Sequence, residues 1–405
     1  MAEKKILTAV EKNKILDQMS EAINKKYGRT ICGRISNSPE LQEQLKIKYI
    51  PFPSPNLNKS IGGGLPRKKI TILSGQEASG KTGTLLELIA KNQSKSPDFY
   101  ALWLESEDSF DPEFAKMLGV DLSRFHIIMY DKDRGAEATL DELISILEAG
   151  KEIFDIVIVN SLKCLSPKAE LENSLTKDTI ALQARFNSKM MRKLNPIVAN
   201  SNAACVLVNH LTTAVGIMGG DPLMDGGGKA IRYYATLRLD FRKQAISESD
   251  PIGKDEGMKV ACYVRKNRCV FDRNPYVKCE FYIVYGEGTE QALEILQVAV
   301  NKKVILKTGA WYKEEDPVTG EPKVLPNGDV LKWQGKVAFK EYCLSHPDYF
   351  NDLQFRCGDN IESLSQEEIA KIEEEEKITE DEISEIEKEI KEEEKKTKKS
   401  KKSDK

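Results

Sequence analysis

Apolar and polar residues follow one another along this chain in blocks that predict a parallel β-sheet covered by helices. Short, continuous apolar runs of strand length precede longer stretches in which apolar residues recur at helical spacing. Strands buried on both faces have continuous apolar runs, and their alternation with helices is typical of α/β folds. The predicted strands are 69–73, 100–104, 153–159 and 205–209, and the helical stretches between them include 138–149 and 177–194.

The pattern changes after about residue 230, where segments 234–241, 259–265 and 277–285 alternate in character and are joined by short turns. This predicts antiparallel strands that extend the sheet. Near the N-terminus, an apolar stripe from Ile15 to Ile23 predicts an amphipathic helix whose apolar face needs a partner. The expected parts are 1–45, the N-terminal helix and linker; 46–288, the main core; 289–360, a small mixed domain; and 361–405, a charged tail.

Composition narrows the class of protein. No apolar run approaches the roughly 20 residues that cross a bilayer, and the N-terminus lacks the apolar core of a signal peptide. The eight cysteines form no C-x-x-C pair, so we expect neither a disulfide framework nor structural zinc, which fits a reducing cytoplasm. Residues 361–405 hold 17 acidic residues and 11 lysines, a pattern typical of a solvated interaction tail.

The most specific motif is a phosphate-binding loop between a predicted strand and a predicted helix. The residues from Gly75 to Thr82 satisfy G-x-x-x-x-G-K-[ST]. In such a loop, backbone N–H groups and the helix N-terminus attract phosphate oxygens, Lys81 reaches the β and γ phosphates, and Thr82 binds Mg²⁺. The predicted ATP-binding residues of the loop are Gly75, Gln76, Glu77, Ala78, Ser79, Gly80, Lys81, Thr82 and Gly83.

Two further positions bear on hydrolysis. Glu105 and Glu107 follow a predicted strand, where a carboxylate can orient the water that attacks the γ phosphate. The apolar run that ends at Val159 is followed by Asn160, where a P-loop enzyme usually has the acid that supports Mg²⁺. An amide attracts the ion less strongly, so weak Mg²⁺ binding or slow turnover is expected.

Several strings in a specific order resemble the RecA recombinases, including their bacteriophage relatives of the UvsX kind. The resemblance covers about residues 15–315 and implies a RecA-type α/β P-loop core: a mostly parallel twisted sheet flanked by helices, an antiparallel extension and a small α+β C-terminal domain. The strings are GGLP at 63–66, EASGKT at 77–82, FDP at 110–112 after Glu107, LGVD at 118–121, SPKAE at 166–170, MRKL at 191–194, YGEG at 285–288 and TGAWY at 308–312.

The resemblance also implies roles for single residues around the nucleotide. Glu107 matches the family's water-activating glutamate and so outranks Glu105. Asp111 and Phe114 match positions that contact adenine. Tyr285 and Gly286 match a patch that touches the nucleotide of the neighbouring subunit.

The resemblance implies catalytic roles for three further residues. Lys266 and Arg268 match the paired lysines that reach the γ phosphate across the subunit interface, one lysine having become arginine, which retains the charge. His210 stands where most of the family has a glutamine that senses the γ phosphate, and histidine can also donate a hydrogen bond to phosphate.

Segments 173–179 and 211–228 resemble the family's two DNA-binding loops, and the second is rich in glycine. Val215 and Met218 match positions that wedge between bases, whereas the cations and backbone amides face phosphates. The predicted DNA-binding residues are Asn173, Ser174, Thr176, Lys177, Arg185, Val215, Gly216, Met218, Gly227, Gly228, Lys229 and Arg232.

The sequence thus predicts an ATP- and Mg²⁺-dependent DNA recombinase that forms a helical filament on single-stranded DNA and pairs it with homologous double-stranded DNA. The family's first helix docks on the adjacent core, and single-strand-binding and loader proteins are expected partners, in the cytoplasm of a bacterium or a phage-infected cell. Two alternatives stay open. Asn160 and His210 favour an ATP-gated DNA-binding or mediator protein with little hydrolysis, and a RecA-like helicase is the other.

Overall fold

The computed structural model describes residues 7–172, 180–213, 223–226, 228–247, 250, 252–272, 274–315, 323–324 and 330–357. The chain divides into two compact units, Met1–Glu294 and Ile295–Lys405. The four-part division expected from the sequence is finer and stays a prediction.

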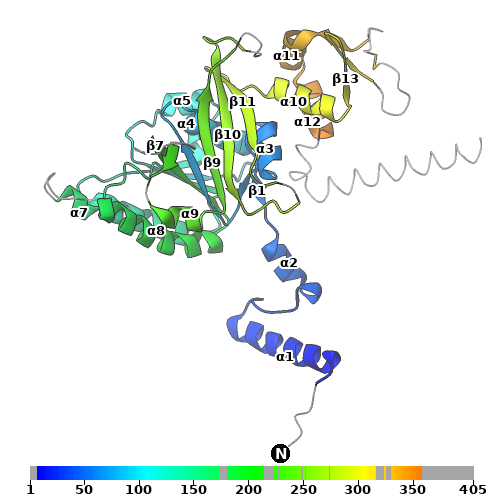
Figure 1. Ribbon diagram of the computed structural model, residues 1–405. Helices are drawn as coiled ribbons and strands as arrows, with labels where there is room; N and C mark the ends of the chain where they lie inside the picture. Colours follow the sequence, from blue (N-terminus) through cyan, green and yellow to red (C-terminus); the bar gives the residue numbers. More distant parts are fainter. Residues whose placement is uncertain are drawn as a thin grey trace, which may run out of the picture. The chain divides into compact units, whose positions relative to one another are not determined.

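The first unit contains most of the helices and strands (Figure 1). In chain order they are α1 (Ala9–Tyr27), η1 (Ile35–Asn37), α2 (Pro39–Leu45), β1 (Tyr49–Ile50), α3 (Pro55–Ile61), β2 (Leu65–Pro66), β3 (Ile70–Gly75), α4 (Lys81–Lys95), β4 (Ala101–Glu105), α5 (Pro112–Met117), η2 (Leu122–Arg124), β5 (Phe125–Met129), α6 (Gly135–Ala149), β6 (Ile156–Asn160), α7 (Lys168–Leu171), α8 (Ile180–Asn200), β7 (Ala204–Thr213), β8 (Leu223–Asp225), α9 (Lys229–Tyr234), β9 (Leu237–Gln244), β10 (Gly257–Asn267), β11 (Lys278–Val284) and β12 (Gly288–Thr289).

One ten-stranded sheet organises this unit, in the order β12-β11-β10-β9-β3-β7-β6-β4-β5, with β8 paired to β7. The strands from β9 to β5 in that order run parallel, whereas β10, β11 and β12 add antiparallel pairs beyond β9. Figure 1 shows β9, β10 and β11 side by side. The mostly parallel α/β sheet and its antiparallel extension, both predicted from the apolar pattern, are confirmed.

Successive residues of the parallel strands point to opposite faces of the sheet, and each face has its own apolar core. In β4, Trp103 belongs to the cluster that includes Leu85 and Ile89 of α4. Its neighbour Leu104 belongs to the second cluster, with Leu143 of α6 and others. Both faces of the sheet are therefore covered, which explains why the strands have unbroken apolar runs.

Two elements differ from their predicted bounds. The strand predicted over 153–159 begins only at Ile156, because Ile153 lies in an exposed turn after α6. The predicted helix 177–194 continues to Asn200 as α8 and includes Pro196. The helix thus extends past a residue that usually ends one.

Helix α1 confirms the N-terminal helix. Thr8 and Glu11 form a capping box at its start, and Gly28 ends it with φ 64°. None of its residues is buried, and its stripe is exposed in the single chain, with Leu16 53% and Met19 57% exposed. An apolar stripe of this kind is the face a helix buries against a partner.

The second unit has a small antiparallel sheet, β13-β14-β15, with helices, as predicted for an α+β domain. Trp333 is buried beside Phe339, Tyr342 and Tyr349, with ring centroids 5.0–5.8 Å away. Its elements are the remainder of α10 (Gln291–Asn301), β13 (Ile305–Thr308), β14 (Trp311–Glu314), β15 (Lys332–Gln334), α11 (Gly335–Ser345) and α12 (Pro347–Arg356). Within the described parts of the chain, we find no helix of the length and apolar character that a membrane span requires.

Candidate nucleotide-binding site

The phosphate loop connects β3, the central strand of the sheet, to α4. Gly80 adopts φ 85° immediately before the first residue of the helix. At Gly75, a Cβ atom would lie 2.5 Å from Ser79 Oγ and 2.7 Å from Phe241 O, so no larger residue fits there. The loop can bend tightly because these two positions are glycines.

Lys81 is folded against this loop and is only 6% exposed. Its Nζ donates hydrogen bonds to the carbonyl oxygens of Gln76 (2.7 Å) and Gly75 (3.2 Å). Burial lowers the pKa of Lys81, although the carboxylates of Glu107 and Glu77 counteract that effect. These contacts hold the ammonium group of Lys81 beside the N-terminus of α4. The N-terminus of a helix also stabilises a bound phosphate group.

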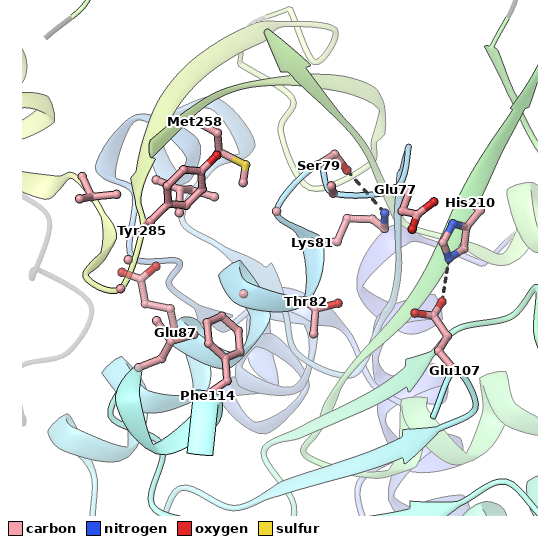
Figure 2. A pocket seen from close by; sticks show the side chains of 18 residues that line it. Glu77, Ser79, Lys81, Thr82, Glu87, Glu107, Phe114, His210, Met258 and Tyr285 are labelled. Carbon is pink, nitrogen blue, oxygen red and sulfur yellow. Dashed lines mark hydrogen bonds and ion pairs between the residues drawn. The ribbon is translucent and has the colours of Figure 1, made fainter. Parts of the chain in front are cut away.

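A pocket opens around the loop and the start of α4 (Figure 2). Figure 2 shows Lys81, Glu107 and His210 on one side of it, and Glu87, Phe114 and Tyr285 on the other. The first side is polar and charged, whereas the second combines aromatic rings with one carboxylate. The lining residues are Glu77, Ala78, Ser79, Gly80, Lys81, Thr82, Gly83, Glu87, Glu107, Phe114, Leu118, His210, Met258, Ile283, Val284, Tyr285, Gly286 and Gly288.

Glu107 and His210 meet directly in this pocket. His210 Nε2 lies 2.7 Å from Glu107 Oε1, and the two side chains are 22% and 21% exposed. The hydrogen bond from His210 lowers the pKa of Glu107, with smaller contributions from Ser161 and Lys81. Glu107 is therefore held ionised, which is the form that can accept a proton from water.

Glu105, the other carboxylate considered for the catalytic base, lies in surroundings that differ from those of Glu107. It is fully buried, and its carboxylate accepts hydrogen bonds from Trp103 Nε1 (2.8 Å), Asn160 Nδ2 (3.0 Å) and the backbone N–H of Glu107 (2.9 Å). A carboxylate with these partners is a structural anchor for the loop after β4. Glu107, which the family resemblance favours as the base, is 21% exposed and lines the pocket, and its role stays a prediction.

The two residues expected to hold Mg²⁺ lie in different surroundings. Thr82 lines the pocket, whereas Asn160 is 1% exposed at the end of β6. Because Nδ2 of Asn160 donates to Glu105, its Oδ1 faces away, and this buried oxygen has no hydrogen-bond partner among the described residues. An unpartnered buried acceptor fits a water of a metal's hydration shell. No group of three or more metal-binding side chains occurs in the described part of the chain.

Tyr285 and Gly286 line the pocket around their own chain's phosphate loop. The reason is the antiparallel extension: β11 passes so close to the loop that a Cβ on Gly80 would lie 2.7 Å from Ile283 Cδ1. Tyr285 follows that strand directly. The expected contact of Tyr285 and Gly286 with the nucleotide of a neighbouring subunit stays a prediction.

Of the two residues expected at adenine, Phe114 lines the pocket, and a Cβ on Gly83 would lie 3.8 Å from its ring. Asp111 instead caps α5, where its carboxylate accepts hydrogen bonds from the backbone N–H groups of Glu113 and Phe114. It is exposed and stands outside the set of lining residues. Its contact with adenine stays a prediction.

Lys266 and Arg268 lie away from the phosphate loop of their own chain. Lys266 pairs with Arg238 of β9, which in turn pairs with Ile72 of β3. Ile72 lies three residues, or about 10 Å, before Gly75, where the phosphate loop begins. Its Nζ donates to the carbonyl oxygens of Arg232 (2.8 Å) and Tyr233 (3.1 Å). Burial, then the charge of Arg268, lowers the pKa of Lys266 to about 8. The contact of this pair with the γ phosphate of another subunit, which the resemblance implies, stays a prediction.

The candidate DNA-binding residues divide into two groups. Arg185 and Lys229 are exposed on α8 and α9, two helices that lie together, and Arg232 is half-buried. Gly228 precedes α9 with φ 91°. The predictions for Asn173, Ser174, Thr176, Lys177, Val215, Gly216, Met218 and Gly227 lie outside the described residues.

The sequence analysis missed several residues that line the pocket. Of these, Glu87 carried a usable signal, since it lies four residues after Gly83 and hence on the same face of α4. The others lie on strands or turns distant in sequence; two of them belong to strings that carry the family resemblance, but no local pattern places any of them at the nucleotide. They are Leu118, Met258, Ile283, Val284 and Gly288.

Comparisons with known proteins agree with this geometry. Residues 14–302 match the RecA N-terminal domain family. Protein RecA of Aquifex aeolicus is 31% identical over 366 residues, which cover 88% of this chain and 98% of that protein. Protein RecA of Thermus aquaticus is 31% identical over 345 residues, which cover 85% of this chain and 93% of that protein. Since the match spans most of both chains, this protein belongs to the RecA family.

Proposed function

We propose that this protein is an ATP- and Mg²⁺-dependent recombinase. It binds ATP in the described pocket, hydrolyses it, forms a helical filament on single-stranded DNA and pairs that strand with homologous double-stranded DNA. The observation that carries the proposal is the 2.7 Å contact between His210 and Glu107 beside Lys81. It joins a group that can activate water to the strand that leads into a predicted DNA-binding loop.

Each group has a separate task. The loop N–H groups and Lys81 bind the phosphates, and Thr82 and Asn160 would hold the hydrated Mg²⁺, which offsets phosphate charge when bound. Glu107 orients and deprotonates the attacking water. His210 lies opposite Gly75 in the register of β7 with β3, so it can exchange its bond to Glu107 for one to the γ phosphate. That exchange frees Glu107 and shifts the end of β7.

Phosphate release with and without single-stranded DNA tests the proposal, with Lys81→Ala as the variant that lacks the phosphate contact. We expect DNA-stimulated release by the native protein and its loss in Lys81→Ala. Strand exchange between single-stranded DNA and a homologous duplex, followed on gels, tests the pairing of DNA strands. Filaments in electron microscopy support this reading, and closed rings would favour a helicase.

A second candidate function is an ATP-gated DNA-binding or mediator protein with little hydrolysis. The neutral Asn160, in place of an acid, favours it because an amide attracts Mg²⁺ less strongly. In that case, ATP strengthens DNA binding while phosphate release stays near background at every Mg²⁺ concentration. A titration of Mg²⁺ in both assays distinguishes the two functions.

A further inference from the structure

The side of the pocket away from the phosphate loop contains a carboxylate with no part in hydrolysis. Glu87 lies on α4 six residues beyond Lys81, which is about 9 Å farther along the helix axis. Figure 2 shows it on the same side as the rings of Phe114 and Tyr285. Aromatic rings of this kind stack on nucleobases. Glu87 is therefore positioned to face the nucleoside rather than the phosphates.

Thr289 of β12 holds the carboxylate in place. Its backbone N–H donates to both oxygens of Glu87, at 3.0 and 2.9 Å, and its hydroxyl donates to Oε2 at 2.7 Å. A Cβ on Gly288 would lie 2.9 Å from the carboxyl carbon, so this glycine permits the close approach of β12. A carboxylate can accept about four hydrogen bonds, and Thr289 donates three to Glu87. The side chain is thus pre-oriented and can still accept from a ligand.

The chemistry of this group restricts the ligand. An ionised carboxylate only accepts hydrogen bonds. Adenine has an amino group at C6, whereas guanine has a carbonyl oxygen there. A carbonyl oxygen facing Glu87 would leave two acceptors opposed and unpaired, which is costly in a partly buried site. Burial raises the pKa of Glu87 although the Thr289 hydrogen bonds lower it, which is consistent with a desolvated position.

We infer that Glu87 determines base specificity by accepting a hydrogen bond from the exocyclic amino group of adenine, with Thr289 as its positioning residue. This inference rests on the proposed nucleotide-binding function of the pocket. It differs from the adenine contact expected of Asp111, whose carboxylate caps α5. The site thereby selects ATP over GTP through one acceptor on α4.

Competition binding against a fluorescent ATP analogue tests this role. The ligands are ATP, GTP and purine riboside triphosphate, which lacks the amino group. In the native protein we expect ATP to bind at least about tenfold more tightly than either analogue, as for the loss of one charge-assisted hydrogen bond. In Glu87→Gln, whose amide can also donate, the preference over GTP falls by about tenfold or more. Glu148→Gln, which changes an exposed carboxylate on α6 outside the pocket, is the control and keeps the native preference.

Three results would overturn the inference: an unchanged ATP-to-GTP ratio in Glu87→Gln, a native preference for GTP, or discrimination by Glu87 against 2′-deoxy-ATP instead of purine riboside triphosphate. A merely structural Glu87 would lower affinity for all nucleotides equally. Should Glu87→Gln fail to fold, Thr289→Val provides the same comparison, with a smaller expected fall. If the native protein binds no nucleotide, the proposed function itself is wrong, which is a distinguishable outcome.

Discussion

His210 and Glu107 form the pair on which the proposed chemistry depends most. The resemblance implies that most of the family has a glutamine at the position of His210. In this chain, Nε2 of His210 lies 2.7 Å from Oε1 of Glu107. Because this contact is the largest cause of the lowered pKa of Glu107, the charge state of the base depends on His210. In the proposed function, His210 therefore influences both the base that activates water and the start of the predicted DNA-binding loop.

Replacing His210 with alanine tests this dependence. The pKa of Glu107 should rise towards its ordinary value, so the acid limb of the pH profile for phosphate release moves to higher pH. DNA stimulation should be lost, while His210→Gln, which restores a hydrogen-bond donor, should retain it. The measurement is phosphate release against pH with and without single-stranded DNA. Unchanged stimulation and an unmoved acid limb in His210→Ala would reject the role.

An asparagine at position 160 stabilises the fold because its amide donates a hydrogen bond to the buried carboxylate of Glu105. Asn160→Asp would place a second carboxylate about where Nδ2 now lies 3.0 Å from Glu105, in a buried site. Two carboxylates at that distance cannot both ionise, so one pKa must rise. We expect the free energy of unfolding at pH 7 to fall by about 2 kcal/mol. The loss should shrink towards pH 5, where protonation costs less.

Denaturant unfolding of four proteins measures this effect: the native protein, Asn160→Asp, Glu105→Gln and the double variant. The double variant restores a single carboxylate and should recover much of the loss. A stable Asn160→Asp at pH 7 would contradict the account. That result would show that the fold tolerates two carboxylates at this site, so repulsion from Glu105 would not explain why residue 160 is an asparagine.

At the scale of elements, β3 and the apolar strands around it follow from their sequence, since each strand is buried on both faces and needs apolar residues throughout. The phosphate loop and Glu107 were recognisable from local motifs. Met258 and Ile283 were not, because strand order brings β10 and β11 to the pocket, and no local pattern specifies that order. The capping role of Asp111 likewise depends on where α5 begins.

The start of α3 is joined to α10 by a buried carboxyl group. Glu294 Oε2 accepts hydrogen bonds from Ser54 Oγ (2.6 Å) and the backbone N–H of Asn56 (3.0 Å), and Ser54 also caps α3. Burial raises the pKa of Glu294 to about 8. This contact ties the first turn of one helix to that of another within the larger unit.

Because burial raises the pKa of Glu294, the buried carboxyl group becomes less favourable to the folded state as pH rises. The folded chain binds the proton more tightly than the unfolded chain, whose carboxyl titrates near 4.5. The stability contribution is therefore fully present below pH 4.5 and is lost as pH rises through about 8. Glu294→Gln, which cannot ionise, should be relatively more stable at pH 8.5 than at pH 5. Chemical unfolding at both pH values checks this, and a pH-independent difference would refute it.

The exposed apolar stripe of α1 is the surface that we expect to contact a second subunit in the proposed filament. A heterologous contact that does not close produces a filament, and the family resemblance implies that this helix docks on the adjacent core. Leu16→Asp places a charge on the stripe, which is exposed in the single chain, so folding should be unaffected. We expect filament length in electron microscopy to fall sharply while ATP binding by the subunit persists. Glu21→Asp, an exposed change beside the stripe, is the matched control.

Persistence of long filaments in Leu16→Asp would show that α1 packs on its own core. Loss of ATP binding together with filaments would instead mean that the pocket needs a neighbouring subunit. Lys266 and Arg268 are the described cations that would explain that dependence, because they lie too far along the sheet to serve their own loop.

The pairing of β7 with β3 has a mechanical consequence. His210 is level with Gly75, and the same strand ends three residues later, at Thr213. A ligand that binds the segment after Thr213 would displace the end of β7. Because His210 lies only three residues before that end, the displacement would reach its partner Glu107, the proposed base. In the proposed function, communication between ATP and DNA then requires no rearrangement of the sheet, merely a small displacement of one strand end.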